Sequence, residues 1–318
     1  MRSGVVGRGS RFALDLLIVS RPVTWCAVLV PFLGGYLVAT RRLVPAGCFV
    51  TDRFDGAQCL AAGWRFGLVL LAMGPMCWLF AFMINDLVDL DADRANPART
   101  NSPLVAGRIS VTAAKRTVVV SALLALLGAA LAGWIFLAIT AVALAISWAY
   151  SAPPLRLKNR PGMDIAACSF LVGTCAVIAG WAIGAPLHGL PWIMPVVAFT
   201  HMASVYVPTT IGDYDSDIAS GDRTVAVRLG RTQTYLIGQA ALIVTCAIYI
   251  SLSVMDYIVP RSMLPIEILG SAVAIVAYHL LFSKEREAKS IVRGMVWLAA
   301  ISVAVMGTGV FLLFTGQI

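Results

Sequence analysis

Long apolar segments alternate with short polar ones along almost the whole chain. A transmembrane helix needs about 20 predominantly apolar residues, and nine segments have this length and character. The pattern therefore predicts an all-α, polytopic membrane protein in which residues 1–318 form a single integral membrane domain. The nine helices are predicted at residues 19–40, 64–84, 116–132, 134–150, 164–184, 191–211, 233–253, 263–283 and 293–314.

The composition agrees with this prediction. Hydrophobic residues make up 59% of the chain and charged residues only 13%, whereas a soluble domain is about 45–50% apolar and about 25% charged. A water-soluble fold of this size has no room to bury so much apolar surface, so the bilayer is the expected solvent. The net charge of +8 does not indicate a nucleic-acid partner, because the Lys and Arg residues lie in short loops, where they set topology.

The basic residues are distributed unequally between the two sides of the predicted bundle. The N-terminal segment and the loops on its side carry 19 of the 24 Lys and Arg residues. Because cytoplasmic loops are enriched in basic residues, this side is predicted to be cytoplasmic and the C-terminus to lie outside. The prediction depends on a turn at Gly133, since one long helix over residues 116–150 would move every later loop to the opposite side.

Two cysteines, Cys48 and Cys59, share the loop that follows the first predicted span. That loop faces outward in the predicted topology, where an oxidising compartment would permit a disulfide. A disulfide and two free thiols are both compatible with the sequence.

Eight of the 16 carboxylates occupy two short segments at the predicted cytoplasmic ends of the second and sixth helices. In the first segment Asn85, Asp89 and Asp93 are spaced four residues apart, which places them on one face of a helix, and Asp86 accompanies them. Carboxylates on one face repel one another unless a cation lies between them. Mg2+ prefers hard oxygen ligands and commonly binds one or two carboxylates together with substrate phosphates.

The second acidic segment has Asp213 and Asp217, again four residues apart. The distance from Asn85 to Asp213 corresponds to about one four-helix unit, which indicates an internal repeat. Two such carboxylate faces across one cavity would hold a diphosphate through bridging metal ions. The alternative is that these are solvated loop carboxylates balanced by nearby basic residues, namely Arg94, Arg99 and Arg223.

A third cytoplasmic segment is basic. Pro153 and Pro154 end the fourth predicted helix, and Arg156, Lys158 and Arg160 follow at once. One interpretation is an anchor that sets topology. The other is a cationic wall that neutralises a leaving diphosphate.

Five segments together resemble the UbiA superfamily of intramembrane prenyltransferases. They read SRPVTW at 20–25, NDLVDLDADRANP at 85–97, SPLVAGRIS at 102–110, YSAPPLRLK at 150–158 and DYDSDIASGDRTVAVRLG at 213–230. Within them, the sequence YSAPPLRLK and the Gly-Asp-Arg at 221–223 are similar to the chlorophyll-synthase-like branch of this superfamily. Two departures, Ser102-Pro103 in place of Arg-Pro and the extra residues 218–220, bear on the substrate more than on the reaction.

The resemblance implies a nine-helix bundle with a large central cavity that lipids can enter and that cytoplasmic loops cap. It also implies a role for each residue that matches a family motif. The metal ligands would be Asn85, Asp86, Asp89, Asp93, Asp213 and Asp217, the diphosphate-binding residues Arg21, Lys158, Arg156 and Arg223, and the residues that carry catalysis Asp89, Asp213 and Lys158.

The expected activity is Mg2+-dependent transfer of a prenyl group from an isoprenoid diphosphate to a lipophilic or aromatic acceptor within the membrane. An alternative from the same family is a terpene cyclase, which uses the same metal ions and no acceptor. A transporter would instead place its charges in the middle of helices, whereas these lie at helix ends. The acceptor and the length of the prenyl chain stay open.

Overall fold

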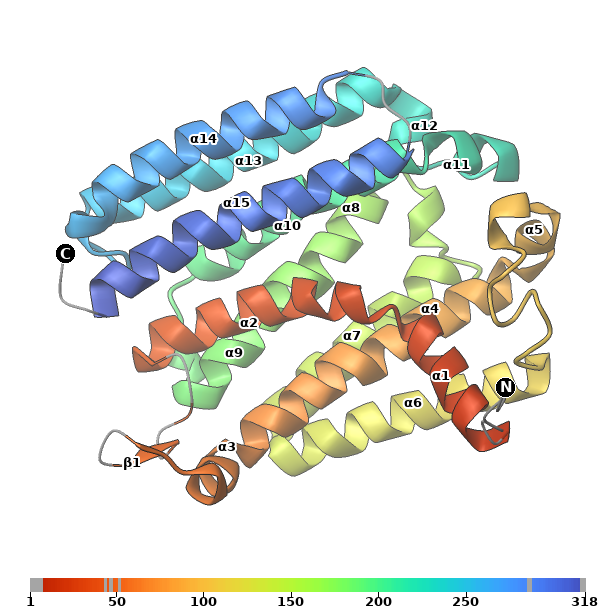
Figure 1. Ribbon diagram of the computed structural model, residues 1–318, viewed down its shortest axis with the longest axis horizontal. Coiled ribbons are helices and arrows are strands. Elements are labelled where there is room, and N and C mark those ends of the chain that lie inside the picture. The colour runs from red at the N-terminus through yellow and green to blue at the C-terminus, as the bar shows by residue number, and fades with distance from the viewer. Residues whose placement is uncertain (1–7, 43–44, 46–47, 51–52, 285–287, 315–318) are drawn as a thin grey trace, which may run out of the picture. The chain divides into compact units, whose positions relative to one another are not determined.

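The computed structural model describes residues 8–42, 45, 48–50, 53–284 and 288–314, and these residues are almost entirely helical (Figure 1). The all-α prediction is thus confirmed, apart from one hairpin of two-residue strands, β1 (Phe49–Val50) and β2 (Arg53–Phe54). Both chain ends, whose sides the sequence analysis assigns, lie outside the described residues.

Eight helical stretches of the described chain are long and apolar enough to cross a membrane, so the protein is a multi-pass membrane protein. The ninth predicted span, 191–211, corresponds to helix α10 (Ile193–Gly212), which has 20 residues but is not among the eight. The polar His201 and several threonines lower the mean hydropathy of α10, so the exact count of nine is not confirmed. The eight stretches are Pro22–Thr40, Gly63–Val88, Val111–Ala132, Trp134–Ser151, Met163–Gly184, Arg231–Val254, Arg261–Phe282 and Lys289–Gly309.

The chain divides into two compact units. Unit 1 comprises residues 1–157 and 175–191, and unit 2 comprises residues 158–174 and 192–318. That all 318 residues form a single domain around one cavity stays a prediction.

The helices are divided between the two units. Unit 1 contains α1 (Arg8–Ser20), α2 (Trp25–Thr40), α3 (Gly56–Leu71), α4 (Cys77–Val88), α5 (Leu90–Ala95), α6 (Val111–Ala132), α7 (Trp134–Ser151) and α9 (Ala176–Gly184). Unit 2 contains α8 (Met163–Cys168), α10, α11 (Tyr214–Ser220), α12 (Val225–Leu229), α13 (Arg231–Val254), α14 (Leu264–Phe282) and α15 (Ala288–Phe314).

Within unit 1, α2 and α9 pack closely along their length (Figure 1). Glycines make this approach possible. A Cβ atom on Gly180 would collide with the Phe32 carbonyl oxygen, and one on Gly35 would collide with the Val177 carbonyl oxygen. Small residues at helix interfaces let backbones come together in membranes, where van der Waals packing drives helix association.

The turn at Gly133 separates α6 from α7, as the topology prediction requires. Gly133 has a φ of 143°, a backbone conformation that residues with a Cβ atom rarely adopt. The guanidinium of Arg65 caps the C-terminus of α6, because its Nε donates to the carbonyl oxygen of Ala132, the last residue of that helix, over 2.9 Å. The two helices pack against each other, so residues 116–150 are a helical hairpin and not one long helix.

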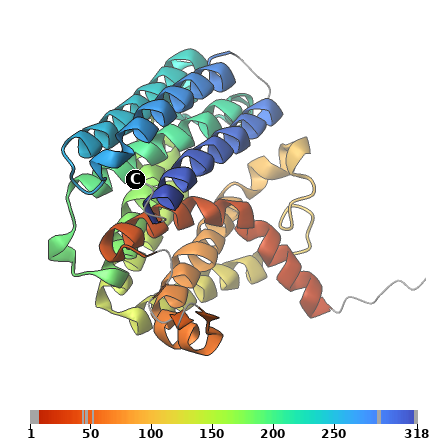
Figure 2. The same cartoon turned by 60° about the vertical axis from the view of Figure 1, so that its left-hand side comes forward.

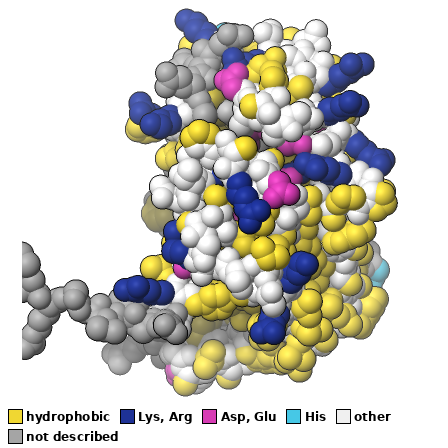
Figure 3. All heavy atoms as spheres, turned by 90° about the vertical axis from the view of Figure 1, so that its right-hand side faces the viewer, with side chains coloured by type: hydrophobic (Ala, Val, Ile, Leu, Met, Phe, Trp, Pro, Cys, Tyr) yellow, Lys and Arg dark blue, Asp and Glu magenta, His cyan; other side chains and the backbone are white. Residues whose placement is uncertain are grey.

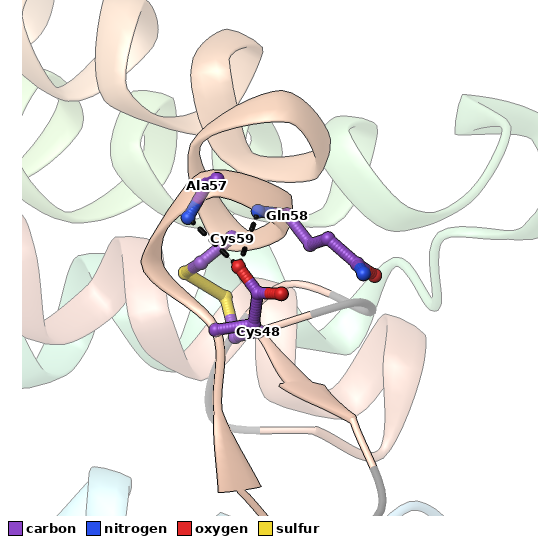
Figure 4. Close-up of a disulfide and its surroundings, with 5 residues drawn as sticks. Cys48, Ala57, Gln58 and Cys59 are labelled. Atoms are coloured by element: carbon purple, nitrogen blue, oxygen red, sulfur yellow. Dashed lines mark hydrogen bonds between the residues drawn. A yellow bond between two sulfur atoms is a disulfide. The ribbon is translucent and has the colours of Figure 1, made fainter.

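Cys48, directly before β1, and Cys59, near the start of α3, form a disulfide that precedes the span Gly63–Val88 (Figure 4). Beside it, the Asp55 carboxylate caps the first turn of α3 by accepting from the N–H groups of Ala57 and Gln58, each over 3.0 Å. The bridge joins the strand hairpin to the start of α3, so the open question about these two cysteines is answered in favour of pairing.

In unit 2, α10, α13, α14 and α15 form a bundle in which α13 and α14 run side by side (Figures 1 and 2). Its core holds the large side chains of Tyr278, Phe282 and Ile291, each at most 2% exposed. The Tyr278 hydroxyl donates to the Ser204 carbonyl oxygen over 3.1 Å. The buried phenol therefore has the hydrogen-bond partner that a buried polar group needs.

The outward faces of the long helices carry exposed apolar side chains, among them Leu123, Leu269 and Trp297. In a soluble protein such a surface would be an interaction site, but on membrane spans it faces lipid. Figure 3 shows apolar side chains over a broad part of the surface, with basic and acidic side chains among them.

Candidate active site

The first acidic segment lies at the junction of α4 and α5. α4 ends at Val88 and α5 begins at Leu90, with Asp89 between them. The Asp89 N–H donates to the Asn85 carbonyl oxygen over 2.9 Å, and the Asp93 N–H donates to the Asp89 carbonyl oxygen over 2.8 Å. The four-residue spacing thus keeps its helical hydrogen bonds across the junction, which favours one shared face for Asn85, Asp89 and Asp93.

The basic segment after α7 meets this acidic segment. Arg156 Nη2 donates to Asp89 Oδ1 over 3.0 Å, and Ser151 Oγ donates to Asn85 Oδ1 over 3.4 Å. Arg156 has a φ of 38°, in the left-handed region that residues other than glycine seldom adopt. Such strained residues concentrate at functional sites, and here the unusual backbone accompanies a contact between two motifs 67 residues apart.

Arg21 stands in a similar relation to Asp86. Its φ is 48°, in the turn between α1 and α2, and its guanidinium carbon lies 4.1 Å from the centre of the Phe82 ring. Arg21 Nη2 is 4.0 Å from Asp86 Oδ1, an ion pair longer than a hydrogen bond. Asp86 is only 5% exposed, and its Oδ1 has no hydrogen-bond partner among the described residues. A buried carboxylate oxygen in this condition is well suited to a cation.

Asp93 is paired with Arg99, whose Nε lies 3.6 Å from Asp93 Oδ1. From the sequence, Arg99 was expected only as a possible balancing charge, because its contact with Asp93 depends on the irregular segment after α5. By contrast, Arg94 and Asp91 form a solvated pair, with side chains 57% and 97% exposed. The solvated-loop interpretation therefore describes Asp91, whereas the Asp86, Asp89 and Asp93 side chains are much less exposed.

The second acidic segment lies at the junction of α10 and α11 in unit 2. Asp213 caps the end of α10 and is exposed, while Asp217 on α11 is partly buried. Burial raises the pKa of the Asp217 carboxyl to about 6. Asp213 and Asp222 raise the Asp217 pKa further by like-charge repulsion, whereas a hydrogen bond from Thr224 and the charge of Lys158 lower it. Asp217 is therefore a carboxylate whose negative charge a nearby cation would stabilise.

The predicted cationic residues of unit 2 differ in burial. Lys158, in the short turn Leu157–Asn159, is 9% exposed and lies within electrostatic reach of Asp217. Arg223 is exposed in the segment between α11 and α12, and it has no ion pair in the described part of the chain. Lys158 is thus the more enclosed cation of unit 2, and Arg223 stays a prediction from the sequence alone.

The carboxylates of the two acidic segments offer suitable oxygen ligands for Mg2+ but no complete coordination sphere. Among the described residues, no three His, Cys, Asp or Glu side chains converge as a preformed metal cage. Mg2+ does not need one, since it usually keeps water ligands and binds one or two carboxylates plus substrate phosphates. The hard carboxylate oxygens of Asp86 and Asp89, one of them buried without a hydrogen bond, match that requirement.

The sequence matches the UbiA prenyltransferase family over residues 28–303. This match covers most of the chain. The chain belongs to the UbiA prenyltransferase family. It is therefore an enzyme of prenyl transfer, and the resemblance drawn from the sequence motifs is confirmed. The narrower likeness to the chlorophyll-synthase-like branch stays a prediction.

Curated relatives of this UbiA protein have different acceptors in their names. A 4-hydroxybenzoate octaprenyltransferase from Albidiferax ferrireducens is 29% identical over 227 residues, covering 70% of this chain and 68% of the relative. A lycopene elongase/hydratase from Haloarcula japonica is 30% identical over 225 residues, covering 69% of this chain and 68% of the relative. A digeranylgeranylglyceryl phosphate synthase from Natronomonas pharaonis is 27% identical, covering 66% of this chain and 71% of the relative.

Solved structures share the fold. The structure of a UbiA homolog from Archaeoglobus fulgidus bound to GPP and Mg2+ superimposes with a TM-score of 0.70 and 24% identity. The match covers 92% of this chain and 99% of that one. A UbiA homolog from Aeropyrum pernix gives a TM-score of 0.67 with 19% identity, over 92% of this chain and 99% of that chain. The prediction of a UbiA-like helical membrane fold is confirmed.

Proposed function

We propose that this UbiA enzyme binds an isoprenoid diphosphate together with Mg2+ and transfers the prenyl group to a lipophilic or aromatic acceptor inside the membrane. The contact of Arg156 with Asp89 carries the proposal, because it joins a basic segment suited to phosphate with an acidic segment suited to metal. The solved homologue that binds GPP and Mg2+ and the named prenyltransferases among the relatives support it.

Both acidic segments supply ligands for Mg2+ in this proposal. Bound Mg2+ shields the negative charge that builds on the diphosphate as the carbon–oxygen bond breaks. Asp86 is deeply buried and Asp89 and Asp217 are partly buried, and a carboxylate removed from water is stabilised by a bound cation, which favours this role. The proposed ligands are Asn85, Asp86, Asp89 and Asp93 of unit 1 and Asp213 and Asp217 of unit 2.

The basic residues bind the diphosphate oxygens. Lys158 is placed to act as a point charge, since the residue is only 9% exposed and an enclosed ammonium attracts phosphate oxygens strongly. Arg21 and Arg156 present planar guanidinium groups, which match phosphate geometry, and Arg223 approaches from the exposed loop. Preorganised cations stabilise a leaving diphosphate without reorganising at the moment of reaction.

The membrane spans supply the rest of the chemistry. Breaking the carbon–oxygen bond generates an allylic carbocation, or a transition state that resembles one, and water would quench it. Apolar helices exclude water from the reacting carbon and accommodate the isoprenoid tail. The acceptor then donates an electron pair to the prenyl carbon and loses a proton.

We further propose that both acidic segments face the cytoplasm. The span Gly63–Val88 has the Cys48–Cys59 disulfide before it and Asp89 directly after it, so these features lie on opposite sides of the membrane. Disulfides persist in oxidising compartments, which supports an external position for the disulfide and a cytoplasmic one for Asp89. The bias of 19 of 24 basic residues supports the same orientation.

A reporter fused after Arg228 tests the orientation. If α10 crosses the membrane as the ninth span, alkaline phosphatase at this position is inactive and a green fluorescent protein at the same position glows. Active phosphatase there would place the second acidic segment outside and refute the proposal.

The reaction is tested with purified protein, Mg2+ and prenyl diphosphates of different chain lengths. Each donor is incubated with and without a panel of acceptors drawn from the relatives, namely 4-hydroxybenzoate, a geranylgeranylglyceryl phosphate and a carotenoid. Mass spectrometry of a transferase shows an adduct only when its acceptor is present. A cyclised hydrocarbon or alcohol formed equally without acceptor would favour the terpene cyclase alternative.

A further inference from the structure

Asp164 is a carboxylate in the first turn of the membrane span Met163–Gly184, and neither the sequence motifs nor the proposed site uses it. It is 0% exposed. A charge removed from water costs several kcal/mol unless hydrogen bonds satisfy it, and ionisable residues at membrane depth are functional candidates by default. The partners of this carboxylate therefore decide what it does.

Its two oxygens bind backbone N–H groups from two different segments. Asp164 Oδ1 accepts from Gly162, in the turn just before α8, over 2.9 Å. Asp164 Oδ2 accepts from Val225, 61 residues later, over 2.9 Å. The first bond holds the carboxylate in its own turn, and the second fixes that turn to the start of α12 in the same unit.

The segment held in this way leads directly to the second acidic segment. Val225 is the first residue of α12, and Thr224 before it is the N-cap. Thr224 Oγ1 donates to Asp217 Oδ2 over 2.9 Å. A short chain of contacts therefore runs from the Asp164 carboxylate through adjacent backbone to the Asp217 carboxylate.

On its other side, Asp164 is connected to the basic segment. It lies six residues after Lys158, which is within electrostatic reach of Asp217. Asp164 thus links the turn that carries Lys158 to the loop that carries Asp217. Because the Asp164 oxygens accept from backbone N–H groups, we expect Asp164 to act through the backbone that it holds and not by binding ligand.

We infer that Asp164 is a positioning residue that holds Lys158 and Asp217 in the geometry needed to bind a Mg2+-diphosphate. The inference rests on the proposed function, because it presumes that these two residues bind the diphosphate and its metal. Partners of this indirect kind typically change metal affinity or activity by about 10–100-fold when they are replaced.

Two substitutions break the link from opposite ends. Asp164→Asn keeps the size of the side chain but turns one acceptor oxygen into a donor. Val225→Pro deletes the N–H that donates to Asp164 and replaces the buried valine side chain with an apolar ring, at a first helical position where proline is favoured. Thr224 before it has φ −67° and ψ 168°, a conformation that a following proline permits.

The readout is the affinity for inorganic diphosphate in the presence of Mg2+, measured by calorimetry on purified protein, with KM and kcat measured in parallel. Both variants are expected to weaken diphosphate binding about 10–100-fold and to raise KM more than they lower kcat. Thr224→Val, which removes the hydroxyl that donates to Asp217, should weaken diphosphate binding in the same way. Thr224→Ser keeps the hydroxyl and should bind diphosphate with wild-type affinity.

Asp15→Asn is the matched control. Asp15 is also a buried carboxylate, 7% exposed, but it is paired with Arg108 over 2.8 Å in unit 1. Its replacement should lower thermal stability and leave diphosphate affinity unchanged. If Asp164→Asn and Val225→Pro behave like Asp15→Asn, the positioning role is wrong. An Asp217→Ala variant distinguishes a wrong positioning role for Asp164 from a wrong proposed site. Unchanged diphosphate affinity in Asp217→Ala would show that Asp217 itself does not belong to the site.

Discussion

The guanidinium of Arg156 lies 3.0 Å from the carboxylate of Asp89, although Asp89 directly follows α4 and Arg156 lies 67 positions later in the segment after α7. Both side chains are largely shielded, at 34% and 12% exposure, so the pair is less screened by solvent than a surface salt bridge. In the proposed site Arg156 orients Asp89 and binds the diphosphate.

Arg156→Ala should therefore lower kcat/KM for the prenyl diphosphate by about 10–100-fold. Arg156→Lys should recover only part of the loss, because an ammonium cannot reproduce the planar guanidinium contact. Arg94→Ala is the control, since Arg94 forms the exposed pair with Asp91 in the same acidic segment, and it should keep its kcat/KM. Equal losses in the Arg156→Ala and Arg94→Ala enzymes would mean that the segment needs positive charge in general and not this contact.

Lys158→Ala should reduce turnover and weaken inhibition by inorganic diphosphate, because it removes the more enclosed cation of unit 2. Inhibition constants for diphosphate measure this directly. Arg160→Ala provides the comparison, because Arg160 is exposed two residues further along the same segment. Unchanged kinetics and unchanged diphosphate inhibition in the Lys158→Ala enzyme would mean that Lys158 does not bind diphosphate and only helps to set the membrane topology.

Gly180→Ala should destabilise unit 1, because the added methyl group collides with the backbone of α2 at Phe32. Forcing extra volume into a packed interface typically costs about 1–3 kcal/mol, which a thermal unfolding assay in detergent detects. Gly34→Ala on α2 is the control, since a Cβ there meets no atom within 4 Å. A Gly180→Ala protein as stable as the Gly34→Ala protein would contradict the close packing of α2 and α9.

Cys48 and Cys59 should resist a membrane-impermeant maleimide in intact cells until a reductant is added, and both should then react. The bridge between them explains the resistance, and their external position explains access after reduction. Labelling of both thiols without reduction would rule out the disulfide. Failure to label even after impermeant reduction would place the loop on the cytoplasmic side.

The sequence predicted the helices well where hydropathy alone determines them. The predicted span 134–150 became Trp134–Ser151, and the predicted span 164–184 became Met163–Gly184. It missed the break at Arg21, which separates α1 from the first span, and a π-helical turn at Ala72–Met76. Both depend on local backbone geometry, to which a count of apolar residues is insensitive.

For the site, spacing identified the acidic and basic segments but not the contacts between them. Arg99 beside Asp93 and Thr224 beside Asp217 come from irregular loops, in which sequence distance says little about spatial distance. Asp164 is detectable in the sequence as a lone carboxylate at the start of an apolar span, yet only the hydrogen bond to Val225 shows which segment it holds.

The most direct test of the account is the Mg2+ dependence of prenyl transfer in enzymes that lack one carboxylate of either acidic segment. Asp89→Ala and Asp213→Ala should insert into the membrane normally and lose turnover at every Mg2+ concentration, as the wild type should in EDTA. Asp91→Ala, whose side chain is 97% exposed in the native protein, should keep the wild-type Mg2+ response. Full activity in the Asp89→Ala or Asp213→Ala enzyme, or wild-type activity that persists in EDTA, would contradict a metal site built from both segments.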